Sequence, residues 1–382
     1  MMNSQQHLSH KRQVDLGSFY TPKSIVDLTY SVLKRNVKDL ENWTIFDSSC
    51  GYGSFLVGDF GKRKIGADVD ESALNEAKSK TKDVQIYKAN SLQNIARQNY
   101  NIATDEKLVI IGNPPYNDAT SMIHQKTKDK FIQNQIDRDV KTRDLGMSFL
   151  LSYDKLHADY ICVLHPLSYL IKKANFASLK MFTKNYKLID GIVISSHEFS
   201  DTSRRTAFPI LIALYKRGEK MDYDFIKKYR FKTMEGTEFC LDDFDTIANY
   251  ISKYPNKNSI SATNNPVAKF YTMRDINALK RSRTFIDSDM SNTVYIVMDK
   301  LPYYCYVDIF KKYADKLPYY LGNCDVIIDN REFEKIKDCF VSESVHSNPI
   351  LKRYYKFHTI SNATQKIEKY FTELLREHIF TP

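Results

Sequence analysis

The sequence predicts an α/β fold in which helices cover a mostly parallel sheet, followed by a smaller α+β domain. In the first half of the chain, short apolar runs alternate with helix-like stretches, and this alternation is typical of parallel strands joined by helices. After about residue 215 the alternation is lost, and Tyr, Lys and Asn become dense. We therefore expect one domain over residues 1–220 and a second over residues 221–382.

The predicted strands and helices follow the chain in order. Expected strands cover residues 44–47, 64–68, 84–87, 108–111, 160–164, 189–194 and 208–215, and the last two could pair as a hairpin. Expected helices begin at about residue 54 and cover residues 71–80, 147–156 and 175–184. In such sheets ligands bind beyond the carboxyl ends of the strands, so the chemistry is expected in the residues that follow them.

The composition indicates a folded, reduced protein without a membrane partner. The 382 residues are 42% hydrophobic and 27% charged, and no run approaches the roughly 18 apolar residues of a membrane span. The polar N-terminus holds no signal segment, which favours a cytoplasmic location. The six cysteines form no C-x-x-C pair, and no His lies at ligand spacing beside one, so we expect free thiols and no metal site.

The charge balance suits a polyanionic partner without requiring one. Lys and Arg number 56 against 46 Asp and Glu, which gives a net charge of +10. Many basic proteins bind no nucleic acid, so this excess leaves the question open. The 26 Tyr and 22 Phe residues could supply stacking surfaces for bases.

Two strand ends carry residues suited to an adenosine-containing cofactor. The turn that follows Asp47 contains Gly51, where the backbone can approach a ligand closely, although a tight connection alone would use similar residues. Asp68 ends the next strand and can accept both hydroxyls of a ribose, whereas Asp70 is better explained as a helix N-cap. Because the third glycine of a dinucleotide motif is absent and Tyr52 would crowd a diphosphate, S-adenosylmethionine is favoured over NAD.

The motif Asn113-Pro114-Pro115-Tyr116 directly follows a very apolar strand. An amino nitrogen conjugated to a ring is a poor nucleophile, because its lone pair is delocalised. If the Asn113 side-chain oxygen and the Pro114 carbonyl both accept its N–H bonds, the nitrogen becomes more tetrahedral and can attack a methyl sulfonium. Prolines fix the backbone for this task, and Tyr116 offers a flat face to a base. A proline-rich turn without function is the structural alternative.

With these motifs the sequence resembles the γ-class N6-adenine DNA methyltransferases of the NPPY type, which occur in restriction–modification systems. The resemblance covers about residues 15–216 and implies a Rossmann-like, S-adenosylmethionine-dependent methyltransferase fold with a C-terminal target-recognition domain. Asn90 departs from the family, which usually has Asp there. The positions that match cofactor-binding positions of the family are Tyr20, Thr21, Pro22, Asp47, Ser49, Gly51, Asp68, Asn90, Asn113 and Phe149.

The resemblance further implies transfer of a methyl group to N6 of an adenine extruded from a specific sequence in double-stranded DNA. The implied catalytic residues are Asn113, Pro114, Pro115 and Tyr116, with Phe199 as a second aromatic against the base. A core role would also explain Phe199. Candidate contacts to DNA, each alone also explained as a solvated charge, are Lys126, Lys128, Lys130, Arg143, Lys280, Arg281 and Arg283.

Other readings stay open at this point. NPPY-type loops also serve methyltransferases of RNA bases and of protein glutamine, and a basic, aromatic C-terminal half could bind RNA as well as DNA. An RNA adenine N6-methyltransferase is therefore the main alternative. A non-catalytic DNA-binding specificity subunit is a further one, although the intact motif argues against it. The expected setting is a restriction–modification system with a partner endonuclease, or a solitary mark, and the resemblance favours a monomer.

Overall fold

The computed structural model describes residues 21–58, 60–116, 135–199, 206–255, 266–356 and 358–379. The chain divides into two compact units, Met1–Phe239 and Cys240–Pro382. This division falls later than the expected boundary at residues 220 and 221. The reason is that two short strands, β8 (Phe231–Thr233) and β9 (Glu238–Phe239), continue the sheet of the first unit.

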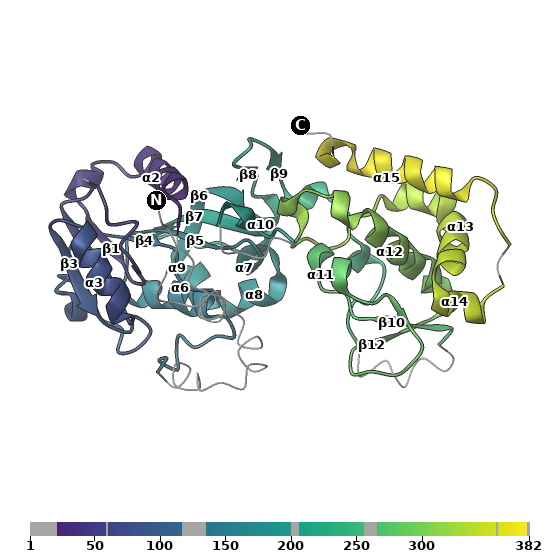
Figure 1. Cartoon of the computed structure of the whole chain (residues 1–382), viewed down its shortest axis with the longest axis horizontal. Coiled ribbons are helices and arrows are strands. Elements are labelled where there is room, and N and C mark those ends of the chain that lie inside the picture. Colours follow the sequence, from purple (N-terminus) through teal and green to yellow (C-terminus); the bar gives the residue numbers. More distant parts are fainter. Residues whose placement is uncertain are drawn as a thin grey trace. The chain divides into compact units, whose positions relative to one another are not determined.

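The first unit is built on a nine-stranded sheet in the order β3-β2-β1-β4-β5-β7-β6-β8-β9 (Figure 1). Its first seven strands are β1 (Thr44–Asp47), β2 (Arg63–Asp68), β3 (Val84–Lys88), β4 (Leu108–Gly112), β5 (Tyr160–Pro166), β6 (Tyr186–Ser195) and β7 (Pro209–Arg217). Strands β1 to β5 pair in parallel. Strand β7 runs antiparallel between β5 and β6, so β6 points the same way as β5. The predicted mostly parallel sheet and the hairpin are confirmed.

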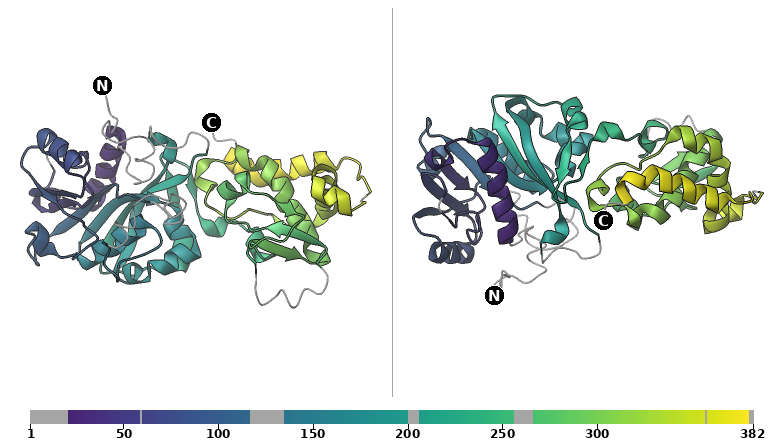
Figure 2. Two further views of the ribbon diagram at one scale, coloured as in Figure 1. Left: turned by 60° about the horizontal axis from the view of Figure 1, so that its bottom comes forward. Right: turned by 90° about the horizontal axis from the view of Figure 1, so that it is seen from above.

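Helices flank this sheet, and its central strands are buried. The helices are α2 (Lys23–Asn36), α3 (Glu71–Lys80), α6 (Leu145–Lys155), α7 (Ser168–Ile171), α8 (Lys173–Ser178), α9 (Lys180–Asn185) and α10 (Tyr223–Lys228). Figure 2 shows α2, in purple, lying along the sheet, where it packs against β5, β6 and β7. All residues of β1 and β4 are buried. The carboxyl ends of these strands are therefore held by a rigid core.

Two predicted helices differ from the structure. The helix expected from about residue 54 was wrong, because residues 51–58 form successive turns. Gly51, Gly53 and Gly58 have φ values of 50°, 75° and 103°, a backbone region that a right-handed helix does not use. The helix expected over residues 175–184 is divided into α8 and α9 at Leu179, whose ψ of 15° is not helical.

The second unit combines a small antiparallel sheet with helices, as an α+β domain does. Its strands, in the order β11-β10-β12, are β10 (Ala268–Tyr271), β11 (Phe285–Ile286) and β12 (Thr293–Ile296). Its helices are α11 (Ile276–Arg281), α12 (Leu301–Tyr313), α13 (Asn330–Ser347), α14 (Pro349–Tyr354) and α15 (Ala363–Ile379). Aromatic rings from α12, α13 and α15 pack together, among them Tyr306, Phe340 and Phe371. This cluster gives the unit a core of its own.

All six cysteines are buried free thiols. Within the described ranges, no helix combines the length and the apolar character that crossing a membrane requires.

Candidate active site

The motifs that the sequence singled out meet at one edge of the large sheet. Strand β1 lies between β2 and β4, and all three run in parallel. The glycine turn after β1, Asp68 at the end of β2 and residues 113–116 after β4 are therefore neighbours. The topology brings together the predicted cofactor and catalytic residues of these three segments.

Asn113 is held at one end of its side chain only. Its Nδ2 donates to the Thr21 hydroxyl at 3.1 Å, while its Oδ1 is buried without a hydrogen-bond partner. Leaving a buried acceptor unpaired costs about 1–3 kcal/mol, so this oxygen is suited to a donor from a ligand. Pro114 beside it is buried, and Pro115 is half-buried.

Asp47 at the end of β1 lies beside Gly112, the residue that precedes Asn113. It is 1% exposed, and its carboxylate accepts from the Ser49 backbone N–H at 3.1 Å. A Cβ at Gly112 would lie 2.6 Å from its Oδ1, so only glycine lets β4 end this close to it. Burial, with a smaller contribution from Asp68, raises the pKa of Asp47 to about 8. The sequence analysis missed Gly112, and the available signal was a glycine that ends an otherwise apolar strand.

Asp68 binds the glycine turn and leaves space beside it. Its Oδ2 accepts from the Gly51 N–H at 2.8 Å and its Oδ1 from the Asp70 N–H at 2.9 Å. Burial raises the pKa of this carboxyl above its usual value. Apart from Gly51 and its two neighbours in the chain, no residue has an atom within 4 Å of the position that a Gly51 Cβ would take, and the nearby Ser49 hydroxyl oxygen is buried without a partner. An open turn, an orphaned hydroxyl and a carboxylate together fit the adenosine half of a cofactor.

The two residues that follow Asp68 differ in their surroundings: Asp70 caps a helix, whereas Val69 is exposed. Asp70 accepts from the backbone N–H groups of Ser72 and Ala73, which confirms it as the N-cap of α3. Val69 between the two acids is 62% exposed. The sequence analysis did not name Val69, although an apolar residue between carboxylates at a strand end was a usable signal. Its exposed side chain offers an apolar surface at the carboxyl end of β2.

Asn90 connects the segment after β3 to the chain that follows residue 134. Its Oδ1 accepts from the Leu92 N–H at 3.0 Å, and its Nδ2 donates to the Gln135 carbonyl at 2.9 Å. The Leu92 carbonyl in turn accepts from the Asp137 N–H at 2.9 Å. A carboxylate could not donate to Gln135, and this bond gives a physical reason for Asn at this position.

Tyr116 is 8% exposed and packs against the start of α6. A Cβ at Gly146 would lie 3.0 Å from the Tyr116 Cβ and 2.5 Å from the Tyr169 hydroxyl. The Tyr169 hydroxyl donates to Asp144, the N-cap residue of α6. Gly146, Asp144 and Tyr169 thus support the candidate stacking residue Tyr116, and the sequence analysis missed all three.

The remaining aromatic candidates are buried. Phe149 in α6 is 6% exposed and contacts Tyr153. Phe199 follows the short helix η3 (Ser196–Glu198) at the end of β6 and is 2% exposed. Because β6 runs in the same direction as β4, Phe199 lies at the same edge of the sheet as Asn113. A base could stack on its ring only after neighbouring side chains move.

The start of α2 holds the two described residues of the leading motif. Thr21 is 5% exposed, and Pro22 occupies the N-cap position. Tyr20 lies outside the described residues.

The candidate DNA contacts are only partly described. Lys126, Lys128 and Lys130 lie outside the described residues. Arg143 is exposed just before α6, and Arg281 and Arg283 are exposed in the second unit. Lys280 differs from them, since its side chain is only 16% exposed and its Nζ lies 3.7 Å from Asp315. Arg281 and Arg283 are therefore better placed than Lys280 to reach a phosphate.

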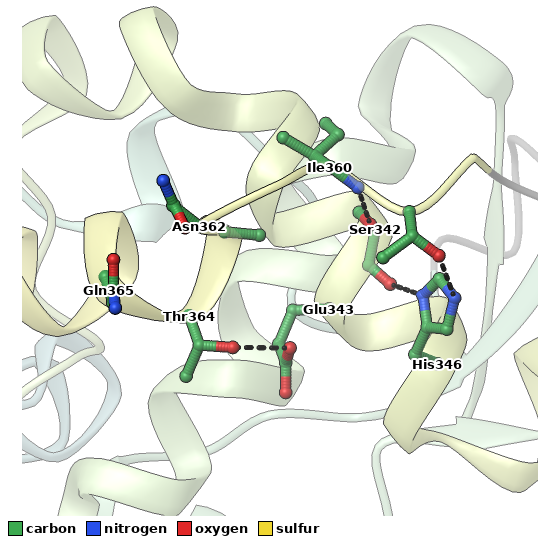
Figure 3. Close-up of a pocket in the computed structure, with 9 residues that line it drawn as sticks. Ser342, Glu343, His346, Ile360, Asn362, Thr364 and Gln365 are labelled. Carbon is green, nitrogen blue, oxygen red and sulfur yellow. Dashed lines mark hydrogen bonds between the residues drawn. The ribbon is translucent and has the colours of Figure 1, made fainter.

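The second unit also contains a cavity of about 260 Å³ between α13 and residues 359–365 (Figure 3). His346 lies between the Ser342 carbonyl, 2.6 Å from its Nδ1, and the Thr359 hydroxyl, 3.1 Å from its Nε2. The Thr364 hydroxyl donates to Glu343. These polar groups bind one another, which is typical of a structural junction between two helices.

Comparison with known proteins places the chain among methyltransferases. The family model described as "N-6 DNA Methylase" matches residues 5–193. The Type II methyltransferase M.CvrRI of Paramecium bursaria Chlorella virus XZ-6E is 25% identical over 315 residues, which cover 80% of this chain and 71% of the relative. The methylase subunit of the Type I restriction enzyme MjaIX of Methanocaldococcus jannaschii is 30% identical over 113 residues, which cover 27% of this chain and 19% of that subunit. Among solved structures, the methyltransferase subunit of a type I restriction–modification system from Streptococcus thermophilus is 17% identical with a TM-score of 0.37, covering 60% of this chain and 48% of that one.

A parallel sheet whose strand ends present a ribose-type carboxylate and a buried amide acceptor has the architecture of an S-adenosylmethionine-dependent methyltransferase. The family match narrows this class: residues 5–193 match the N-6 DNA methylases, and together with the restriction–modification relatives this match supports methyl transfer from S-adenosylmethionine to adenine in DNA. The predicted family, fold, cofactor and reaction are confirmed. The alternatives of an RNA methyltransferase and of a non-catalytic subunit are not favoured.

Proposed function

We propose that this protein is the modification methyltransferase of a restriction–modification system and that it methylates N6 of one adenine within a specific sequence of double-stranded DNA. The similarity to a Type II methyltransferase over 80% of the chain supports this setting. The partner would be an endonuclease of the same specificity, and the enzyme would act as a monomer on one strand at a time. The observation that carries the proposal is the buried, unpartnered Asn113 Oδ1, which lies at the same edge of the sheet as the proposed cofactor residues.

In this mechanism Asn113 and Pro114 bind the substrate amino group. The Asn113 Oδ1 and the Pro114 carbonyl accept its two N–H bonds and direct the nitrogen lone pair toward the methyl donor. Tyr116 stacks on the extruded base, and Phe199 is the candidate for its other face. When bound, S-adenosylmethionine would supply the electrophilic methyl group, which would pass from sulfur to the amino nitrogen and leave S-adenosylhomocysteine. The surplus proton of the amino nitrogen leaves to water.

The cofactor would be held by the residues that follow β1, β2 and β3. Asp68 would accept the ribose hydroxyls through lone pairs that Gly51 and Asp70 do not use, and the Ser49 hydroxyl would bind beside the open Gly51. Exposed Val69 would contact the adenine ring. The other proposed cofactor contacts are Tyr20, Thr21, Pro22, Asp47, Asn90 and Phe149.

The second unit, Cys240–Pro382, is proposed as the target-recognition domain. It lies wholly beyond the region that the resemblance covers and carries exposed Arg281 and Arg283. Arginine binds phosphates and guanine through two parallel N–H bonds, so either contact suits this pair. The proposed contacts in the first unit are Arg143 and, outside the described residues, Lys126, Lys128 and Lys130.

The test is methyl transfer from labelled S-adenosylmethionine to unmethylated plasmid DNA, with ribosomal RNA in parallel. We expect label in N6-methyl-deoxyadenosine at a small set of sites that sequencing can map. Asn113→Ala removes one of two acceptors and should lower the methylation rate by about 10²–10³-fold. Asn99→Ala, at an exposed asparagine of the same unit, is the matched control. Label in RNA alone, or wild-type rates in Asn113→Ala, would contradict the proposal.

A further inference from the structure

The catalytic amide can bind the substrate in only one of its two orientations. An asparagine amide has nearly the same shape when it is turned over, but one end accepts hydrogen bonds and the other donates them. Only the orientation with Oδ1 toward the substrate can accept an N–H bond of an amino group. A residue that accepts from the NH₂ end of the amide would favour this orientation before the substrate arrives.

In the structure that residue is Thr21. The Asn113 Nδ2 donates to the Thr21 Oγ1 at 3.1 Å across 92 positions of sequence, and Oδ1 stays buried and unpartnered. The Thr21 side chain is itself 5% exposed, so water does not compete freely for its hydroxyl. The bond thus occupies the donor end of the amide and leaves the acceptor end for a ligand.

The position of Thr21 is fixed because it directly precedes α2, which is anchored to the sheet. The Pro22 carbonyl next to it accepts from the backbone N–H groups of Ile25 and Val26, which starts the helix. At the other end of α2, Arg35 donates two hydrogen bonds to the Asp190 carboxylate of β6, at 2.6 and 2.8 Å, and Asn36 donates a third. A hydroxyl on such an anchored segment can orient a side chain of the catalytic loop.

We propose that Thr21 is a positioning residue that holds the Asn113 amide with its oxygen toward the substrate amino group. The proposal rests on the proposed function, since an amino substrate is what requires the oxygen. Without the hydroxyl, the buried NH₂ group would lose its acceptor and turn toward the side where water or substrate can accept. The amide would then present a donor to a donor and could not bind the amino group.

The experiment compares Thr21→Val, which removes the hydroxyl and keeps the branched shape, with Thr21→Ser, which keeps the hydroxyl. On plasmid DNA we expect kcat of Thr21→Val to fall at least about 10-fold, the factor that corresponds to about 1.4 kcal/mol. Thr21→Ser should stay within about 3-fold of wild type, a margin smaller than that factor. Because Thr21 is also a candidate cofactor contact, cofactor KM is measured alongside, and it should change less than kcat. A kcat of Thr21→Val within twofold of wild type would overturn the proposal, as would equal losses in both variants.

A second measurement reports the hydrogen bond without activity. In protein labelled with ¹⁵N at asparagine, the Asn113 side-chain signals are identified by their loss in Asn113→Ala. We expect one amide proton to be shifted downfield and slow to exchange in wild type and in Thr21→Ser, but not in Thr21→Val. If Thr21→Val does not fold, Thr21→Ala serves both measurements. An unshifted wild-type signal overturns the positioning role even if DNA is methylated. A shifted signal in protein that labels no DNA counts against the proposed function instead.

Discussion

Each unit of this enzyme buries an aspartate, and the two carboxylates differ in how many hydrogen bonds they accept from the protein. Asp308 in α12 of the second unit is 8% exposed and accepts from the Thr284 hydroxyl at 2.5 Å, the Ser344 hydroxyl at 2.7 Å and the Asn348 amide at 2.9 Å. Asp47 at the end of β1 is 1% exposed and accepts from the Ser49 N–H, and burial raises its pKa to about 8.

The amides show the same contrast. Asn348 uses both ends of its side chain, since its Oδ1 accepts from the Ile350 N–H and its Nδ2 donates to Asp308. Asn113 leaves its Oδ1 unpartnered. At these residues, Asp308 and Asn348 are thus satisfied within the fold of the second unit, whereas Asn113 at the proposed site keeps bonding capacity for a ligand. Substitutions that remove each kind of group should therefore separate stability from binding.

The largest expected effect is on stability, from Asp308→Ala. Two buried hydroxyls and one half-buried amide would lose their shared acceptor, and the free energy of unfolding should fall by about 3 kcal/mol. Urea unfolding followed by circular dichroism measures this loss. The affinity for S-adenosylmethionine should stay within twofold of wild type. Asp315→Ala, at an 87% exposed acid of the same unit, should change stability by less than about 0.5 kcal/mol. If both variants lost the same amount of unfolding free energy, the hydrogen bonds of Asp308 would not be what stabilises the second unit.

Asp47→Asn should have the opposite effect on stability, and it depends on pH. The folded-state pKa of Asp47 is raised from 3.8 to about 8, so its contribution is fully present below pH 3.8 and is lost as the pH rises through 8. The amide has no charge to bury, so Asp47→Asn should gain stability over wild type between pH 5 and pH 9. We expect a gain of at least about 1.4 kcal/mol, the value of one pKa unit. Urea unfolding of both proteins at the two pH values measures it, and parallel curves would contradict the raised pKa.

The same substitution should weaken cofactor binding. A sulfonium cation is attracted by the ionised form of Asp47, which becomes populated as the pH approaches 8. From pH 6 to pH 9, the affinity of wild type for S-adenosylmethionine should therefore rise at least about 10-fold more than that of Asp47→Asn, or about 1.4 kcal/mol. Calorimetric titration of both proteins cancels the titration of the ligand itself. The same pH dependence in both proteins would show that Asp47 does not respond to the cofactor.

The smallest expected effect comes from Asn90→Asp, because only one hydrogen bond is lost. A carboxylate cannot donate to the Gln135 carbonyl, which accepts from Asn90 at 2.9 Å. The loss of about 1 kcal/mol should raise the Kd for S-adenosylmethionine about 5-fold. Asn99→Asp, at an exposed position of the same unit, controls for the added charge. An unchanged or lower Kd in Asn90→Asp would show that the hydrogen bond to Gln135 does not contribute to cofactor binding.

Much of the first unit could be predicted because its signals are local. Apolar runs bounded by turns identified the strands, and the pairing of β6 with β7 followed from two such runs close together. The helix expected at residue 54 failed because Gly51, Gly53 and Gly58 all adopt positive φ, which the glycine-containing motif permitted but did not specify. The sequence did not predict that the first unit extends to residue 239, because β8 and β9 are too short to show a periodic pattern.

By itself, the sequence determined the fold class, the order of the motifs and the residue types of the proposed site, because each depends on neighbours along the chain. Only the tertiary structure decided which of these residues touch. Thr21 reaches Asn113, Asp47 meets Gly112, and Asn90 binds Gln135 across 45 to 92 positions of sequence. Such contacts depend on the order of strands in the sheet and on where each strand ends. These are properties of the packed core, and local periodicity does not encode them.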